Sequence, residues 1–167
     1  MAHRVSLWAT AATAVLALSW PSNPTNIRLI YNPTISVPRG WYLVEHQCEL
    51  RLNEYVLAHI PTDAAALAND RHYLPTSVPL LKRIGAVGHQ FACAVDDNIL
   101  IDNRVAARAL VHDGAGRKLD VWNGCRALTA EEIFLLSEAN PASFDSRYFG
   151  PIPRANVIGK ARPLWTW

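Results

Sequence analysis

The sequence has no dense run of lysine or arginine and no closely spaced cysteines. Its 16 basic and 14 acidic residues leave a net charge of +2, and no stretch carries the concentrated positive charge of a nucleic-acid site. The three cysteines stand far apart and the six histidines are scattered without ligand spacing, so we expect no metal. Internal repeats and low-complexity tracts are also absent. These absences exclude a nucleic-acid-binding protein and a zinc module.

The chain is long enough, and apolar enough, for one folded domain with an appendage. It has 167 residues, of which 50% are hydrophobic, and this content supports a real core and argues against disorder. Three cysteines allow one disulfide and one remaining thiol in an oxidising compartment.

The first twenty residues differ from the rest. A small positive start at His3 and Arg4 precedes an uncharged run over residues 5–20, which is shorter than the roughly 20 apolar residues of a comfortable span. It is interpreted as an uncleaved membrane anchor, or as a signal peptide that ends near residues 17–19; a buried soluble helix explains it less well. Because positive charge stays inside, both export interpretations place the remaining chain outside the cytoplasm.

After a proline- and asparagine-rich linker at residues 21–26, the pattern of residues 27–167 is mostly β. Branched and aromatic residues predict strands, and two of the strands flank a hairpin turn at Asp96 and Asp97. The predicted strands are 27–31, 41–45, 54–60, 80–87, 91–95, 98–101, 132–136 and 156–160. Residues 62–69 predict a short helix with Thr62 as its cap, and residues 114–117 a loop. We therefore expect a mainly β domain, an antiparallel β-barrel or folded sheets, with an apolar N-terminal helix.

Three stretches contain side chains suited to catalysis. In TISVPRG (residues 34–40), Ser36 lies between two prolines, on a turn that can expose its hydroxyl; such a serine is usually only a turn residue. In a strand LLKRI (residues 80–84), Lys82 shares its face with Leu80 and Ile84. A lysine kept from water favours its neutral form and can act as a base, although most strand lysines reach solvent.

The third stretch is SFDSRYFGP (residues 143–151), in which Asp145 and Arg147 can pair and support a loop. Alone, it fits a polar surface turn equally well.

Together, the three stretches resemble the signal peptidase I clan, and most closely its TraF branch of conjugative-transfer signal peptidases. The matching segments are NPTISVPRGWY (32–42), VPLLKRIGAV (78–87), PASFDSRYFGP (141–151) and the tail IGKARPLWTW (158–167). The resemblance covers nearly the whole exported portion, and the third segment is the most specific.

The resemblance implies a role for each matching residue. Ser36 is the expected nucleophile, and Lys82 is the base that takes its proton. The hydroxyl of Ser36 is therefore expected to lie within about 3 Å of the amine of Lys82, the reach of a hydrogen bond. Thr34 is expected to form the oxyanion hole with the backbone N–H of Ser36. Ser143 is expected to orient the lysine, and the pair Asp145 and Arg147 to support the site. No cofactor is required.

The resemblance further implies a serine endopeptidase of the bacterial inner membrane, with its catalytic domain on the periplasmic side. Its expected partners are the membrane and a protein precursor, a pilin subunit for conjugation, which it cleaves or cyclises. Two alternatives remain: a housekeeping type I signal peptidase that removes signal peptides, and a catalytically silent component of a conjugation apparatus. Self-cleaving repressors are excluded because an apolar segment occupies the place of their DNA-binding region.

The cysteines give one further prediction. Cys93 follows the strand of Lys82, and Cys125 precedes the strand that leads to Ser143. If both border one sheet, a disulfide between them would brace the return of the chain to the site, and Cys48 would remain free. The sequence alone does not fix the pairing.

Overall fold

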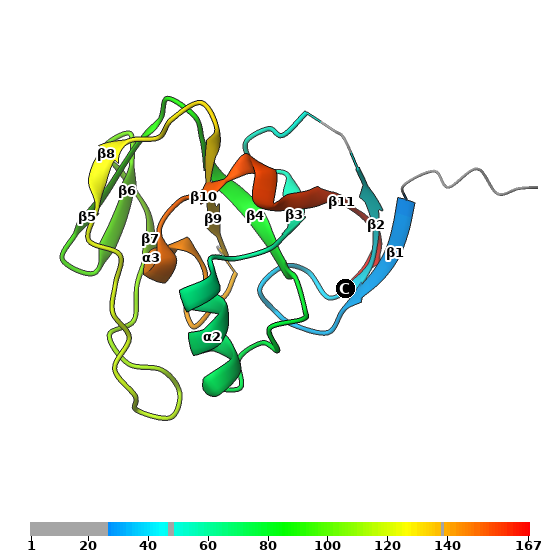
Figure 1. Ribbon diagram of the computed structural model, residues 1–167, viewed down its shortest axis with the longest axis horizontal. Coiled ribbons are helices and arrows are strands. Elements are labelled where there is room, and N and C mark those ends of the chain that lie inside the picture. Colours follow the sequence, from blue (N-terminus) through cyan, green and yellow to red (C-terminus); the bar gives the residue numbers. More distant parts are fainter. Residues whose placement is uncertain (1–26, 47–48, 138) are drawn as a thin grey trace, which may run out of the picture.

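The computed structural model describes residues 27–46, 49–137 and 139–167. These residues form two antiparallel β-sheets, one of seven strands in the order β1-β2-β11-β3-β4-β9-β10 and one of four in the order β7-β6-β5-β8 (Figure 1). The predicted N-terminal anchor or signal segment (1–20) and the linker (21–26) lie outside the described residues, and so does Cys48.

The larger sheet contains the residues that flank the candidate site. Its strands are β1 (Ile27–Asn32), β2 (Gly40–Glu45), β3 (Tyr55–Ala58), β4 (Leu80–Val87), β9 (Glu132–Leu136), β10 (Ile152–Pro153) and β11 (Val157–Thr166). The smaller sheet is inserted between β4 and β9, and its strands are β5 (Phe91–Val95), β6 (Asn98–Ile101), β7 (Arg104–Arg108) and β8 (Cys125–Ala127). The helical elements are α2 (Thr62–Asp70), α3 (Ser146–Phe149) and the 3-10 helix η1 (Arg154–Asn156).

The prediction of a mainly β, antiparallel fold is confirmed. The predicted bounds of β4, β5, β6 and β9 match those of the structure. In β4 buried and half-buried residues alternate along the whole strand, which is the periodicity that a sheet with two different faces imposes. The strands therefore hold Lys82 on the face that the sequence predicts.

The expected closed barrel is absent from the part of the chain that the structure describes. The larger sheet has two ends, β1 and β10, that do not pair with each other. At one end β10 is only two residues long, and one of them is Pro153, which has no N–H to donate to a further strand. The alternative of folded sheets describes the structure correctly.

The predicted cap of α2 is wrong by one position. The helix begins at Thr62, so Pro61 occupies the capping position, and no side-chain hydrogen bond caps this end. Proline tolerates this place because the first N–H groups of a helix have no partner inside it.

Three apolar clusters fix the strands relative to one another. One joins β3, β4, β9 and β10 around Ile84 and Leu135. A second fills the space between the two sheets around Phe134 and Ile99, and a third anchors the start of β2 with Val37 and Tyr42. Because each cluster contains a strand next to the candidate site, core packing holds the loop after β1, the strand β4 and the loop after β9 together.

Candidate active site

The loop between β1 and β2 is organised by the buried side chain of Asn32. Its amide nitrogen donates to the carbonyls of Thr34 at 2.9 Å, Val37 at 3.2 Å and Pro38 at 3.1 Å. Its amide oxygen accepts from the N–H of Thr34 at 3.1 Å and from the Thr34 hydroxyl at 2.8 Å. An asparagine at a strand end commonly folds the next residues around itself in this way. Ser36 is therefore presented by a loop of defined shape.

Two further contacts close this loop onto the sheet. The hydroxyl of Tyr42 donates to the carbonyl of Pro38 at 2.6 Å. Gly40 has a φ of +139°, and a Cβ there would lie 2.0 Å from the carbonyl oxygen of Trp165, so this position requires glycine. The far end of the loop is thus held against β11.

Lys82 lies on β4 and is almost completely buried, with 2% of its surface exposed. Leu80 and Ile84, the neighbours on its own face, are buried too. Burial lowers the pKa of Lys82 to about 8. The Asp145 carboxylate raises this pKa and the Arg147 guanidinium lowers it, but burial has the largest effect. This lysine therefore has a substantial neutral fraction near physiological pH.

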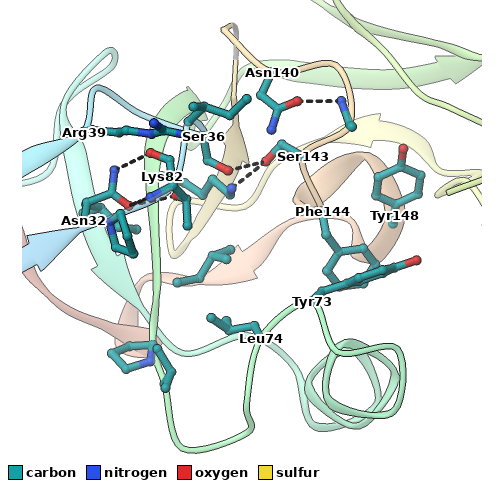
Figure 2. A pocket seen from close by; sticks show the side chains of 18 of the residues that line it. Asn32, Ser36, Arg39, Tyr73, Leu74, Lys82, Asn140, Ser143, Phe144 and Tyr148 are labelled. Carbon is teal, nitrogen blue, oxygen red and sulfur yellow. Dashed lines mark hydrogen bonds between the residues drawn. The ribbon is translucent and has the colours of Figure 1, made fainter. Parts of the chain in front are cut away.

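Ser143 lies between Ser36 and Lys82 and contacts both (Figure 2). The amine of Lys82 donates to Oγ of Ser143 at 2.5 Å, and Oγ of Ser143 lies 3.1 Å from Oγ of Ser36. Within the described residues, the hydrogen bonds of Ser36 and Lys82 meet at Ser143 and do not join the two directly. The structure thus brings the three predicted side chains together in one chain of contacts.

Asp145 and Arg147 form a buried ion pair behind Ser143. The guanidinium donates to both carboxylate oxygens at 2.8 Å, and both side chains are essentially inaccessible to solvent. Arg147 also donates to the carbonyls of Arg108, Asn140, Pro141 and Ser143. Asp145 caps α3 through the N–H of Arg147. Because these bonds satisfy both charges, the pair fixes the loop that carries Ser143.

The contacts of Thr34 differ from the role in the oxyanion hole that the sequence predicted. The hydroxyl of Thr34 donates to Asn32 and is not directed toward Ser36. Among the described residues, the backbone N–H of Ser36 has no hydrogen-bond acceptor. That N–H is therefore available to a substrate oxygen, whereas Thr34 would first have to release Asn32.

A cleft of about 630 Å³ opens above these residues. Ser36, Lys82 and Ser143 lie at its lining, and apolar and aromatic side chains make up most of the remainder: Ile30, Tyr31, Ile35, Leu57, Tyr73, Leu74, Val78, Leu80, Leu81, Leu110, Leu119, Phe144 and Tyr148. Phe144 and Tyr148 stack with ring centroids 5.5 Å apart. The size and lining suit a peptide segment with apolar side chains.

Cys93 and Cys125 are not among the residues that line the cleft. Cys93 of β5 and Cys125 of β8 are register partners in the smaller sheet and form a disulfide, which is the predicted pair. No group of three metal-binding side chains occurs in the described ranges. Among the helices of residues 27–46, 49–137 and 139–167, none is long and apolar enough to cross a bilayer.

Asn32 is a residue of the site that the sequence did not reveal as such. The predicted strand 27–31 ends one residue before it, and an asparagine followed by Pro33 is a local signal for a turn. The structure shows that this side chain shapes the loop that carries Ser36.

A family model and two related proteins match most or all of the chain. The family model "Signal peptidase, peptidase S26" matches residues 2–167. The chain is 32% identical over 179 residues to "Conjugal transfer protein TraF" of Agrobacterium tumefaciens, covering 100% of this chain and 99% of that protein. It is 31% identical over 147 residues to "Plasmid transfer protein TraF" of Escherichia coli, covering 81% and 82%. A signal peptidase I crystal structure from Enterococcus faecalis aligns with a TM-score of 0.39 and 18% identity, over 68% of this chain and 97% of that one.

Proposed function

The chain belongs to the signal peptidase family, peptidase S26, and we propose that it is a membrane-associated serine endopeptidase that matures an exported precursor with Ser36 and Lys82. The observation that carries this proposal is the chain of contacts from Ser36 through Ser143 to the buried Lys82, at the lining of an apolar cleft. A hydroxyl nucleophile, a proton acceptor of lowered pKa and a free N–H donor are the groups that amide cleavage needs.

In the first step, Oγ of Ser36 attacks the carbonyl carbon of the scissile peptide bond. The proton of Ser36 ends on the neutral amine of Lys82, and the carbonyl electrons form an oxyanion that accepts from the N–H of Ser36. When the oxyanion collapses, the C–N bond breaks and the leaving amine takes the proton from Lys82. Ser36 is then esterified with the acyl part of the precursor.

In the second step, the ester is opened by a nucleophile from which Lys82 removes a proton. Water gives a free carboxylate by hydrolysis, whereas an N-terminal amine of the same chain gives a cyclic product by aminolysis. In both cases the proton held by Lys82 returns to Oγ of Ser36 as the ester breaks. The chemistry of Ser36 permits both outcomes, because the acyl intermediate is the same.

The supporting groups have separate tasks in this mechanism. Ser143 holds the amine of Lys82 in place through its Oγ, and Arg147 holds the backbone of Ser143 through its carbonyl at 2.9 Å. No cofactor enters either step, since the nucleophile, the base and the oxyanion donor all come from the chain. A residue that only orients another should affect turnover more than substrate binding.

The proposed substrate is a pilin subunit of a conjugation system, and the proposed location is the periplasmic side of the bacterial inner membrane. Two relatives are named for conjugal or plasmid transfer, and the uncharged run over residues 5–20 predicts an anchor or signal segment. The apolar lining of the cleft suits the apolar segments of such precursors.

The test is precursor processing in membranes that contain the full chain. A conjugative pilin precursor and a precursor with an ordinary signal peptide are supplied separately, together with the unaltered protein, Ser36→Ala and a control, Ser146→Ala, which removes a buried hydroxyl that contacts the backbone of Leu135. We expect processing of the pilin precursor alone, its loss in Ser36→Ala and its retention in the control.

Each other outcome contradicts a defined part of the proposal. Equal processing of both precursors would favour the housekeeping signal peptidase. Processing by Ser36→Ala would remove Ser36 as nucleophile, and no processing by any form would favour a silent assembly component. The mass of the product distinguishes hydrolysis from cyclisation, because the cyclic product is lighter by one water.

A further inference from the structure

The side chain of Ser137, at the end of β9, is buried with 3% of its surface exposed and contacts the backbone of the nucleophile. Its hydroxyl donates to the carbonyl oxygen of Ser36 at 2.6 Å. The two residues are 101 positions apart in the sequence. A short, largely buried bond of this kind holds a particular peptide group in place.

This bond adds a second side chain, besides that of Asn32, that binds the backbone of the loop that carries Ser36. Asn32 binds the carbonyls of Thr34, Val37 and Pro38, but the carbonyl of Ser36 lies outside its reach. Ser137 binds the carbonyl of Ser36 from the segment that follows β9. The orientation of the Ser36 residue, and hence of its Oγ and its N–H, is thereby held by two side chains, those of Asn32 and Ser137.

Ser137 is in turn held by the buried ion pair. Its N–H donates to Oδ2 of Asp145 at 2.9 Å, and its Oγ accepts from the N–H of Asn140 at 3.3 Å. Arg147 binds the carbonyl of Asn140 at 3.1 Å. The hydroxyl therefore has both a donor and an acceptor, so its proton is directed to Ser36 and not to another partner.

From these contacts we propose that Ser137 is a positioning residue for the nucleophile, a role that rests on the proposed function of Ser36. The loop after β9 then acts on Ser36 at two points. Ser143 contacts its side chain at 3.1 Å, and Ser137 contacts its backbone. Figure 2 shows Ser143 of this loop next to Ser36. The buried pair holds the backbone of both residues, because Asp145 accepts from the N–H of Ser137 and Arg147 donates to the carbonyl of Ser143.

The consequence is specific to the chemical step. Without the hydroxyl of Ser137, the peptide that follows Ser36 can rotate, and the N–H and Oγ of Ser36 lose their common alignment with the substrate carbonyl. Substrate binding along the apolar cleft is left largely unchanged, because Ser137 is not among the residues that line it. The loss should therefore appear in kcat and not in KM.

The experiment compares Ser137→Ala with Ser146→Ala and Ser137→Thr in the full chain. Ser146 provides the matched control, because its hydroxyl is also buried and bonded to a backbone group, the N–H of Leu135 at 2.9 Å, but it does not contact Ser36. We expect Ser137→Ala to lower kcat roughly tenfold with KM nearly unchanged, about the effect of one hydrogen bond. Ser137→Thr, which keeps a hydroxyl, should restore most of the rate.

The readouts separate positioning from a purely structural role. Thermal unfolding of Ser137→Ala and Ser146→Ala should show similar losses, whereas the rate should fall in Ser137→Ala alone. Equal rates in these two variants, or no recovery in Ser137→Thr, would overturn the inference. If Ser137→Ala does not fold, Ser137→Cys, which keeps the volume but donates weakly, takes its place. Failure of the unaltered protein to process any precursor would instead contradict the proposed function.

Discussion

Raising the pH should increase the rate of cleavage, because the working form of Lys82 is its neutral amine. With a pKa of about 8, roughly one-tenth of the molecules carry the neutral amine at pH 7. The ordinary value of 10.5 would leave only about 0.03% in that form. Burial of Lys82 on β4 therefore increases the reactive fraction about 300-fold near neutral pH.

The same burial lowers the stability of the folded chain at a pH at which Lys82 is charged. The unfolded chain keeps the Lys82 proton up to a pH of about 10.5, whereas the folded chain releases it near 8. Between these values the unfolded state binds more protons, so stability rises with pH across this window. Below a pH of about 8, the buried charge of the amine lowers the free energy of unfolding by about 3 kcal/mol.

Lys82→Met tests both consequences. Methionine keeps an unbranched apolar chain of similar length, so the variant should be inactive but more stable than the unaltered protein at pH 7. The gain should approach 3 kcal/mol, about the cost of the charge, reduced by the lost bond to Ser143. The stability gain should disappear above a pH of about 10.5, where both states of the unaltered protein are neutral.

Two assays give the result. Initial rates of precursor cleavage are measured from about pH 6 to about pH 10, and urea unfolding of both proteins is measured from about pH 6 to about pH 11, so that it includes the pH at which the stability gain should disappear. The rate should rise with a midpoint near 8, the pKa of Lys82. A rate that falls over this range, or a Lys82→Met variant that is less stable than the unaltered protein at pH 7, would refute the reasoning.

Three other predictions follow from the contacts. Replacing Cys93 and Cys125 by serine should lower the free energy of unfolding by about 4 kcal/mol, because the disulfide no longer restricts the unfolded chain. Urea unfolding without reductant measures this loss, and an unchanged midpoint would contradict the prediction. Asp145→Ala or Arg147→Ala should each cost about 3–5 kcal/mol, since each leaves a buried charge unpaired, and stabilities close to that of the unaltered protein would show that water replaces the partner. Ser143→Ala should keep the fold and lose turnover; loss of stability equal to that of the ion-pair variants would make Ser143 structural as well.

The sequence predicted those strands whose residues alternate or are richly branched. β4 and β9 carry buried aliphatic residues, and their bounds could be predicted from composition alone. β7 and β8 were not predicted. All three residues of β8 are exposed, and β7 has two exposed arginines at its ends and only the small side chains of two alanines to pack against the core. These strands are defined by pairing with β6 and β5, which a local pattern does not contain.

The short helix α3 was missed for a similar reason. It has only four residues, and it is stabilised by the cap that Asp145 provides and by the burial of Arg147, not by an apolar periodicity. The segment was recognised as a supporting motif, but its backbone shape depends on hydrogen bonds from Arg147, one of them to the distant carbonyl of Arg108.

The candidate site was predicted unevenly. Burial of Lys82 followed from its apolar neighbours on one strand face, a local property of the sequence. The position of Ser143 between Ser36 and Lys82 could not be predicted in this way, and a direct contact between Ser36 and Lys82 was expected instead. Contacts such as that of Ser137 with Ser36 join residues about a hundred positions apart, and only the packed fold brings them together.

Processing of a precursor by Lys82→Arg is the most direct test of the central claim, that the neutral amine of Lys82 accepts the proton of Ser36. Arginine keeps the positive charge but does not lose its proton at accessible pH. Lys160→Arg is the matched control, because Lys160 is half-buried, pairs with Glu54 and is not among the residues that line the cleft. Both variants are expressed at equal level in membranes and checked for folding. The account predicts normal processing by Lys160→Arg and none by Lys82→Arg, whereas substantial processing by folded Lys82→Arg would contradict it.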